Sequence, residues 1–371
     1  MINRKRIIDT FSAMVDIDSL SFKERQMADH VTARLTELGF TVKEDNAGEK
    51  IGGSAGNVYG YLPGTLDTTP LLFSAHMDTV EPGIGRKAIL QADGRITSDG
   101  TTILGADDQA GIAATLEAVQ TIQEKGLPHR PIEVLFTVAE EAHCMGSAAI
   151  DSAMIQSKEA YVMDLNGHIG TAAYRAPAIM SFTATVKGKA SHAGVAPQDG
   201  IHAIRAAALA VSRLELGHVG EEMTVNVGVI EGGSASNVIP DTCKVVGEIR
   251  GFDQTATLAQ LDQIGACFHQ AAAEVGATVD WAPDVTFAAY GAEEGSLAIE
   301  RYRAACEQLG LPVSLITTYG GSDLNNLATF GIGGLVISNG MVDCHSVGEY
   351  IVADDLEKLA NLVVALMTSE V

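Results

Sequence analysis

The chain has 371 residues, of which 46% are hydrophobic and 19% are charged, a balance typical of a globular protein rather than a disordered one. With 24 basic and 47 acidic residues the net charge is −23, which argues against nucleic acid and anionic membranes as partners. At about 100–200 residues per domain, the length allows two domains.

The N-terminus and the cysteines bear on where the protein works. Bases within Met1–Arg6 resemble the start of a signal peptide, but Asp9 and Asp16 interrupt the apolar stretch that should follow. No segment approaches the roughly 18 apolar residues that would span a bilayer. The five cysteines are odd in number, scattered and without a CxxC pair. We therefore expect reduced thiols in a cytoplasmic protein without a membrane partner.

Apolar periodicity predicts alternating helices and strands in the first half of the chain. In chain order we expect one or two helices over 5–38, strands at 41–43, 57–62 and 71–76, a long loop with one hairpin over 81–106, a helix from Asp107, and strands at 132–138 and 161–163. Three of these apolar strands end in acidic or histidine residues. This pattern is typical of an α/β sheet whose ligand site lies beyond the carboxyl ends of its strands.

The pattern changes after residue 175. Alternating strands at 178–189, 224–230 and 245–250 flank helices near 201–211 and 257–273, an order that predicts an α+β domain of ferredoxin-like type. A helix over 294–309, strands at 313–316 and 334–337 and a last helix over 353–369 then resume the first pattern. We predict a split domain, 1–175 with 287–371, and an inserted domain, 176–286.

The segment Gly83–Ala88 formally matches the GxGxxA dinucleotide fingerprint. That fingerprint must open a helix, whereas the residues that follow are rich in turn formers. A nucleotide-dependent enzyme is therefore only a minor alternative hypothesis.

Histidine and carboxylate residues follow the buried strands. His76 and Asp78 are two residues apart on an extended segment, so their side chains can meet and the carboxylate can fix the imidazole that binds a metal. Asp107 begins a helix, where an N-cap is the ordinary explanation, although its two oxygens could bridge two cations. Adjacent Glu140 and Glu141 face different directions, so one can bind metal while the other acts as general base.

Asp164 and His345 complete the series, each after an apolar strand. The segments Ser74–Val80, Gly105–Asp108, Thr137–Glu141, Asp164 and His345–Tyr350 together resemble the peptidase T-like branch of the aminoacylase/carboxypeptidase G superfamily. The resemblance covers nearly the whole chain in order. It implies an α/β/α catalytic domain of mixed sheet, with an inserted lid and dimerisation domain, and two zinc ions per chain, with Mn²⁺ or Co²⁺ as alternatives.

The resemblance also implies roles. His76 and Asp164 would hold one ion, Glu141 and His345 the other, and Asp107 would bridge them. Glu140 would be the general base and Asp78 would orient His76. The implied substrate contacts come from the inserted domain and a later loop: His192, Asn237, Arg250, Gly321, Ser322 and Asp323.

The resemblance implies a homodimeric metallopeptidase that removes the N-terminal residue from tripeptides. Two alternatives stay open: an N-acyl amino acid or carboxypeptidase-type amidohydrolase on the same scaffold, and a weakly active metal- or peptide-binding homologue. The last is motivated by Gln109, where many relatives have lysine, and by the residues that flank Glu140 and Glu141.

Overall fold

The computed structural model describes residues 2–370, which form two compact units. The first unit extends to Arg175 and resumes with Gly291–Thr318 and from Ser322 onward. The second comprises Ala176–Tyr290 and the short segment Tyr319–Gly321. The inserted segment expected at 176–286 therefore lies inside the second unit.

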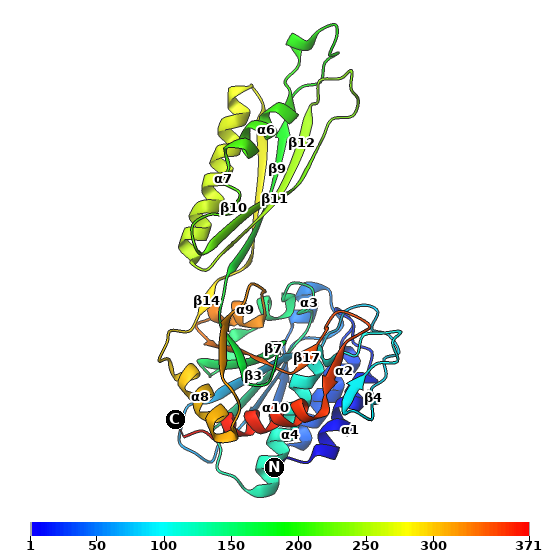
Figure 1. The fold of residues 1–371 in the computed structure, drawn as a ribbon, viewed down its shortest axis with the longest axis vertical. Coiled ribbons are helices and arrows are strands. Elements are labelled where there is room, and N and C mark those ends of the chain that lie inside the picture. Colours follow the sequence, from blue (N-terminus) through cyan, green and yellow to red (C-terminus); the bar gives the residue numbers. More distant parts are fainter. Residues whose placement is uncertain (1, 371) are drawn as a thin grey trace. The chain divides into compact units, whose positions relative to one another are not determined.

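The first unit is built on a mixed sheet (Figure 1). Its helices are α1 (Arg4–Val15), α2 (Arg25–Glu37), α3 (Ala47–Ile51), α4 (Ala106–Lys125), α5 (Met145–Ala148), α8 (Leu297–Leu309), α9 (Asp323–Thr329) and α10 (Ala353–Met367). The strands of its main sheet are β1 (Thr41–Glu44), β2 (Val58–Leu62), β3 (Leu71–His76), β6 (Ile132–Thr137), β7 (Glu159–Leu165), β8 (Thr171–Ala176), β14 (Tyr290–Gly291), β15 (Ser314–Thr317) and β16 (Gly333–Ser338). A smaller sheet holds β4 (Ile89–Leu90), β5 (Arg95–Thr97), β17 (Met341–Val342) and β18 (Tyr350–Val352).

The central strands of the main sheet run in the order β6-β3-β7-β16 and are mutually parallel. Their carboxyl ends therefore meet at one edge. Strands β3 and β6 are buried along their whole length, as expected when both faces of a parallel sheet are covered. Strands β2 and β8 are antiparallel to their neighbours β6 and β16, which makes the sheet mixed.

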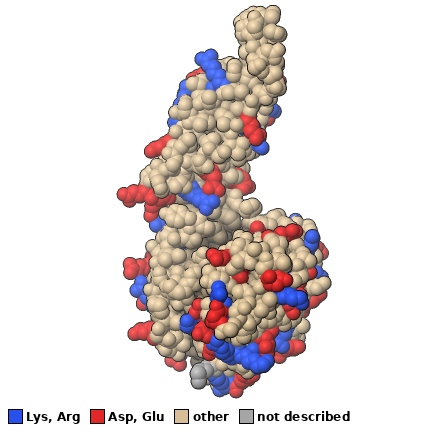
Figure 2. Space-filling view, turned by 45° about the vertical axis from the view of Figure 1, so that its right-hand side comes forward, with Lys and Arg blue, Asp and Glu red and all other residues tan. Residues whose placement is uncertain are grey.

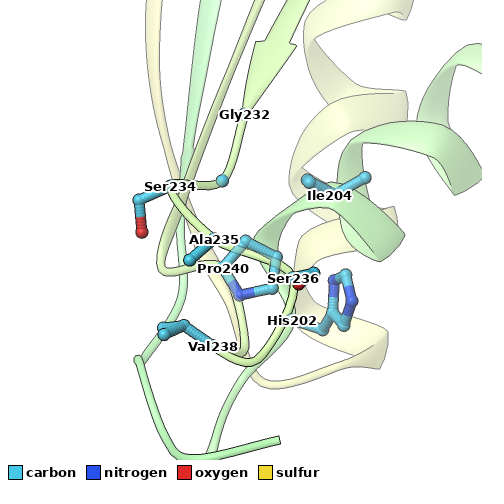
Figure 3. A pocket seen from close by; sticks show the side chains of 9 residues that line it. His202, Ile204, Gly232, Ser234, Ala235, Ser236, Val238 and Pro240 are labelled. Carbon is cyan, nitrogen blue, oxygen red and sulfur yellow. The ribbon is translucent and has the colours of Figure 1, made fainter.

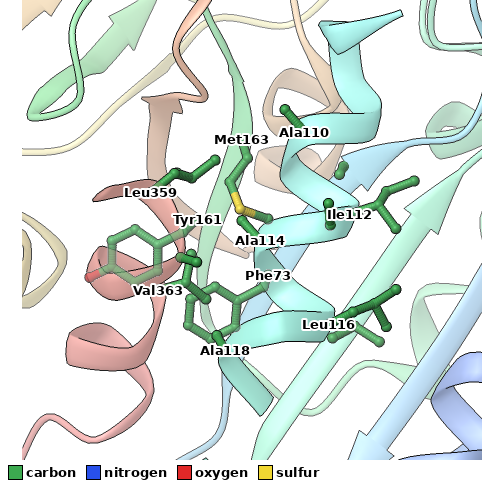
Figure 4. Packing of buried hydrophobic residues seen from close by; sticks show 14 of the residues in the cluster. Phe73, Ala110, Ile112, Ala114, Leu116, Ala118, Tyr161, Met163, Leu359 and Val363 are labelled. Carbon is green, nitrogen blue, oxygen red and sulfur yellow. The ribbon is translucent and has the colours of Figure 1, made fainter. Parts of the chain in front are cut away.

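Helix α4 packs on β3 and β7, and α10 packs against α4. Figure 4 shows the side chains at this contact, including Phe73, Leu116, Met163 and Val363. Leu116 is 2% exposed and the other three are no more than 1% exposed. The rings of Phe73 and Tyr161 stack at 5.8 Å between centroids. Burial of this size fixes the strands and so fixes the loops that leave their ends.

The second unit has a five-stranded antiparallel sheet in the order β10-β11-β12-β9-β13. Its elements are β9 (Ala178–Lys187), α6 (Ala203–Arg213), β10 (Gly217–His218), β11 (Met223–Gly232), β12 (Thr242–Gly251), α7 (Gln254–Glu274) and β13 (Thr278–Phe287). Helices α6 and α7 pack together and onto the sheet. Apart from the short β10, this is the expected ferredoxin-like order, and the predicted fold class is confirmed.

The observed elements also answer several local predictions from the sequence. The helical stretch over 5–38 is two helices, and the loop over 81–106 contains the hairpin β4–β5. Strand β8 was not expected. Among residues 2–370 no helix has the length and apolarity needed to cross a membrane. The five cysteines are unpaired. On the face in Figure 2, acidic and basic side chains are interspersed over both units.

Candidate metal centre

Four of the expected residues lie at the carboxyl ends of three parallel strands. His76 ends β3, Glu140 and Glu141 follow β6, and Asp164 lies near the end of β7. In the register His76 pairs with Thr137, so the loop after β6 starts beside the histidine. The sheet therefore gathers these side chains at one edge, as predicted.

Asp107 lies between two histidines. Its Oδ1 is 2.9 Å from Nε2 of His76, and its Oδ2 is 3.2 Å from Nε2 of His345. The same His345 nitrogen is 2.8 Å from Oε1 of Glu141. Each oxygen of one carboxylate thus faces a different imidazole, which is the arrangement that a bridging carboxylate needs.

His345 reaches this cluster by a different route from the one expected. The apolar strand β16 ends at Ser338, and the chain then passes through β17 before it arrives at His345. His345 lies in a loop with φ of 61°, a left-handed conformation that is uncommon for a residue other than glycine. Its side chain is 52% exposed, whereas His76 is 1% exposed. His345 therefore follows the apolar strand β16, as expected, but only after an intervening turn and β17.

Asp78 holds more than His76. Nδ1 of His76 lies 2.9 Å from the main-chain oxygen of Asp78 and 3.5 Å from the carboxylate oxygen Oδ1. Because a carbonyl can only accept, Nδ1 carries the hydrogen and Nε2 is left free for a metal. The Asp78 carboxylate accepts the main-chain N–H groups of Glu140 (2.9 Å) and Glu141 (3.1 Å) and the hydroxyl of Ser21 (2.7 Å).

Two further side chains, Glu24 and Cys144, fix the loop that carries Glu140. Buried Glu24 accepts the main-chain N–H of Ala139 at 3.1 Å, and Ala139 has a φ of 50°. The thiol of Cys144, also in a left-handed conformation, donates to Oε1 of Glu140 at 3.0 Å. These contacts fix both the backbone and the carboxylate of Glu140.

The charges of the cluster are strongly coupled. Burial and the nearby Asp164 raise the pKa of Glu140 well above its usual value, and burial with Asp107 does the same to Asp164. Burial opposes the ionised form of Asp107, but hydrogen bonds from His345 and His76 outweigh it and hold its pKa well below the usual range. Hydrogen bonds to Asp107 and Glu141 raise the pKa of His345 to about 10.

The donor set fits divalent cations. Ligand atoms of His76, Asp107 and Asp164 all lie within 4.8 Å of one another, and Asp107 and His345 belong to a second such group with Cys344. Imidazole and carboxylate donors suit Zn²⁺, Mn²⁺ and Co²⁺. Buried carboxylates at this density need compensating positive charge, which two cations would provide.

The expected substrate contacts divide between the units. His192 and Asn237 lie together in loops of the second unit: the N–H of Ala193 donates to the Asn237 carbonyl at 3.0 Å, and a β-bridge joins His192 to Val238. A neighbouring cavity has a volume of about 400 Å³ and is lined by Gly232–Ser236, His202 and Pro240 among others. Figure 3 shows these lining residues.

Arg250 lies at the other end of β12 from these loops. Its Nε donates to Glu248 at 2.7 Å and its Nη1 to the carbonyl of Tyr319 at 2.6 Å. Gly321 belongs to the same second unit. The eight residue steps from Thr242 to Arg250 correspond to roughly 25–30 Å of strand, so Arg250 is far from the start of β12.

Ser322 and Asp323 belong to the first unit, where Ser322 is the N-cap of α9. Asp323 is 1% exposed, and its two oxygens accept the hydroxyls of Ser147 and Thr137, each at 2.5 Å. This buried position does not agree with the expected role of Asp323 as a direct substrate contact. Asp323 instead binds Thr137 and Ser147, which lie on either side of the loop that carries Glu140.

Several supporting residues escaped the sequence analysis. Glu24 and Cys144 hold the Glu140 loop, Asp108 accepts the main-chain N–H of His76 at 3.3 Å, and Glu349 accepts that of Asp107 at 3.1 Å. Asp108 and Glu349 did carry a signal, because both lie in the family-like segments, one next to Asp107 and the other four residues after His345. The contact between Glu24 and Ala139 joins distant segments and leaves no local pattern.

A mixed α/β unit with clustered imidazoles and carboxylates beyond its strands is typical of a metal-dependent hydrolase. A profile of the peptidase dimerisation domain (M20_dimer) matches residues 175–277, and one of peptidase family M28 matches residues 57–194. The Bacillus subtilis protein YqjE is 36% identical over 367 residues, 99% of each chain.

Two solved structures are similar over almost their full length. The aminopeptidase PepT of Bacillus cereus has a TM-score of 0.95 at 37% identity, and a tripeptidase of Staphylococcus aureus has 0.92 at 34%. Each comparison covers 99% of this chain and 98% of the other. The chain belongs to the peptidase T-like branch of the aminoacylase/carboxypeptidase G superfamily of metallopeptidases, as the motifs predicted.

Proposed function

We propose that this protein is a dinuclear aminopeptidase that removes the N-terminal residue from small peptides, with tripeptides as its preferred substrates. The observation that carries this proposal is the position of Asp107, whose two oxygens lie 2.9 Å from His76 and 3.2 Å from His345. The tripeptide preference is supported by the descriptions of the B. cereus and S. aureus structures as an aminopeptidase and a tripeptidase.

We assign the ligands as the motifs implied. His76 and Asp164 would hold one cation, Glu141 and His345 would hold the other, and Asp107 would offer one oxygen to each. We expect Zn²⁺, with Mn²⁺ or Co²⁺ able to replace it. When bound, the cations supply Lewis acidity that polarises the scissile carbonyl and makes water a better nucleophile near neutral pH.

Glu140 takes the proton from the attacking water and passes it to the leaving amine. The contacts of its loop suit this role. The Asp78 carboxylate accepts main-chain N–H groups of this loop and so clamps its backbone. The Cys144 thiol, 3.0 Å away, orients one carboxylate oxygen of Glu140. The low-dielectric surroundings favour the protonated form between the two transfers.

The second unit is proposed to join two copies of the chain. Strand β11 pairs with β10 only at Thr224 and Val225, so within residues 2–370 no strand pairs with the outer edge of Asn226–Gly232. On this edge Val229 is 40% and Ile230 51% exposed. An unpaired edge with exposed apolar residues favours pairing with another chain.

The dimer also explains the position of the substrate contacts. A tripeptide is at most about 11 Å long. His192 and Asn237 lie near one end of β12 and Arg250 near the other, roughly 25–30 Å apart along the strand. One small peptide cannot touch all three within one copy. We propose that His192 and Asn237 serve the substrate of the partner subunit.

A substrate panel with metal analysis tests the function. Purified protein is assayed with tripeptides, dipeptides, N-acylated amino acids and blocked peptides. We expect free tripeptides to be cleaved fastest, with about two metal ions per chain. Preference for N-acylated substrates would overturn the aminopeptidase proposal, and a metal content well below two would overturn the dinuclear one.

Two variants separate catalysis from binding. Glu140→Gln keeps the shape of the side chain but removes the base, so we expect loss of turnover with metal retained. Glu300→Gln, at an exposed position on α8, is the matched control and should behave as the parent. Residual turnover in Glu140→Gln equal to that of the control would exclude Glu140 as the base.

A further inference from the structure

The GxGxxA segment contains a buried arginine, Arg86. Gly83–Ala88 is followed by strand β4 rather than by a helix, so it is not a dinucleotide fingerprint. A side chain on Gly83 would come within 2.5 Å of the carbonyl oxygen of Val80, and Gly85 has a φ of 72°. The tight loop places Arg86 inside the first unit, where it is 1% exposed.

Arg86 packs directly behind the segment that leads to Asp107. Its Nη2 donates to the carbonyl of Ile17 at 2.5 Å and contacts Oγ of Ser19 at 3.3 Å. Its Nη1 lies 2.0 Å from the point where a Cβ on Gly105 would stand. Nε and Nη1 have no hydrogen-bond partner in the described structure. Burying a guanidinium with so few hydrogen bonds costs free energy, and a nearby negative charge would offset that cost.

The nearby Glu349 supplies that negative charge. Its buried carboxylate accepts the main-chain N–H groups of Leu104 (2.8 Å), Gly105 (2.7 Å) and Asp107 (3.1 Å). Arg86 and Glu349 both meet Gly105: Nη1 of Arg86 lies 2.0 Å from the point where a Cβ on Gly105 would stand, and Glu349 accepts the Gly105 N–H at 2.7 Å. Burial lowers the pKa of Arg86 to about 10, and the charge of Glu349 opposes that shift. The arginine therefore offsets the charge of the carboxylate that anchors residues 104–107.

Gln109 contacts the same buried point. Its Nε2 lies 3.4 Å from Oγ of Ser19, the atom that Arg86 also contacts, and its Oε1 has no partner in the described structure. A cationic side chain at position 109 would therefore come close to the place of the guanidinium. With a neutral amide at 109, Arg86 provides the positive charge on this side of the loop.

We propose that Arg86 is a positioning residue for the metal-bridging carboxylate: its positive charge balances Glu349, which in turn fixes the backbone of Leu104–Asp107. This inference rests on the proposed function, because it takes Asp107 as the bridging ligand. It accounts for two sequence features that the proposed function leaves unexplained, the GxGxxA match and the glutamine at 109.

Moving the charge tests the proposal. Metal-depleted protein is titrated with Zn²⁺ by calorimetry for the parent, Arg86→Met, Gln109→Lys and the double variant. We expect Arg86→Met to lose about 10- to 100-fold in metal affinity, the range for residues that support metal ligands. Gln109→Lys alone brings two buried cations to one oxygen and should lower thermal stability. In the double variant the lysine replaces the lost charge, so affinity should return to within a few-fold of the parent.

The control is Arg95→Met, which removes an exposed arginine from the neighbouring hairpin and should not change affinity. Arg86→Met with affinity equal to or above that of the parent would overturn the proposal, because a cation that only repels metal ions would strengthen binding when removed. If Arg86→Met does not fold, the double variant decides: recovery of folding and affinity supports the proposal, and failure overturns it. Absence of binding in the parent protein would instead overturn the dinuclear function.

Discussion

Asp78 connects the proposed metal ligand His76 to the proposed general base Glu140. Its main chain holds Nδ1 of His76 at 2.9 Å, and its carboxylate holds the backbone of Glu140 and Glu141 at 2.9 and 3.1 Å. One buried residue thereby sets the distance between the imidazole at the end of β3 and the carboxylates after β6. A change at Asp78 should therefore affect catalysis as well as metal binding.

Asp78→Asn tests this double role. The amide can accept only one of the two main-chain N–H groups, and its NH₂ meets the other, so the Glu140 loop should shift. We expect kcat to fall about 10- to 100-fold, with weaker binding of at least one metal ion. Steady-state kinetics and metal analysis measure both. Asp93→Asn, in an exposed turn, is the control, and an unchanged kcat in Asp78→Asn would contradict the clamp.

Protonation of the metal-free cluster predicts how its stability depends on pH. In the folded protein the pKa of His345 is raised to about 10, and those of Glu140 and Asp164 are also raised. A group with a raised pKa binds more protons when folded, so stability falls as pH rises. For His345 the stabilisation is complete below about pH 6.5 and is lost as pH rises through about 10.

We therefore expect the melting temperature of chelator-treated protein to fall between pH 6.5 and pH 9.5. Metal replaces the protons of its ligands, so added Zn²⁺ should stabilise the protein more at the upper end of this range. Thermal unfolding with and without Zn²⁺ measures the effect. His345→Ala should flatten the curve of the metal-free protein. A metal-free protein whose stability rises with pH would contradict these pKa shifts.

At the scale of elements, the strained backbone lies where the strands end. Ala139, His143, Cys144, Asp343 and His345 all have φ between 50° and 64°, and all lie in the two loops that carry Glu140, Glu141 and His345. Such conformations cost on the order of 1–3 kcal/mol each and persist only where the surroundings fix them. Here Glu24, Asp78 and the short helix α5 supply the support.

Helix α5 contacts the end of β6 through a glycine. A Cβ on Gly146 would lie 1.9 Å from the carbonyl oxygen of Val138, so no larger residue fits without moving α5. Gly146→Ala should cost about 1–3 kcal/mol of unfolding free energy. It should also lower kcat, because Cys144 moves with the helix and contacts Glu140.

Denaturant unfolding and steady-state kinetics measure the two effects of Gly146→Ala. Gly333→Ala is the control, since a Cβ there meets no atom within 4 Å and the residue is exposed. It should change stability by about 0.5 kcal/mol or less. Equal behaviour of the two variants would show that α5 does not support the loop.

The elements were predictable from the sequence where their signal is local. Apolar runs predicted the central strands of the main sheet, and alternating apolar residues predicted the strands of the ferredoxin-like domain. The ends of the central strands predicted the positions of His76, Glu141 and Asp164. Supporting contacts between segments far apart were not predictable: Glu24 and Ala139, for example, are 115 residues apart in the chain. The exposed position of His345 was not predictable either, because it depends on the turn through β17 that follows the apolar strand β16.

At the scale of the whole molecule, the proposed site is complete only in a dimer. The first unit holds the proposed metal ligands and Glu140, whereas His192 belongs to the second. If the partner subunit supplies His192, neither His192→Ala nor Glu140→Gln protein has an intact site. A mixed dimer does have one, made of Glu140 from the first variant and His192 from the second.

We therefore expect activity to return when the two inactive variants are mixed under conditions that exchange subunits. Random pairing makes half of the dimers mixed with one intact site each, so recovery should approach about a quarter of the parent activity. Mixing is verified by mass spectrometry of the intact dimers. Ile230→Lys, placed on both variants, puts a charge on the open edge of β11 and should prevent both the dimer and the recovery. Verified mixed dimers without activity would show that each copy works with its own His192.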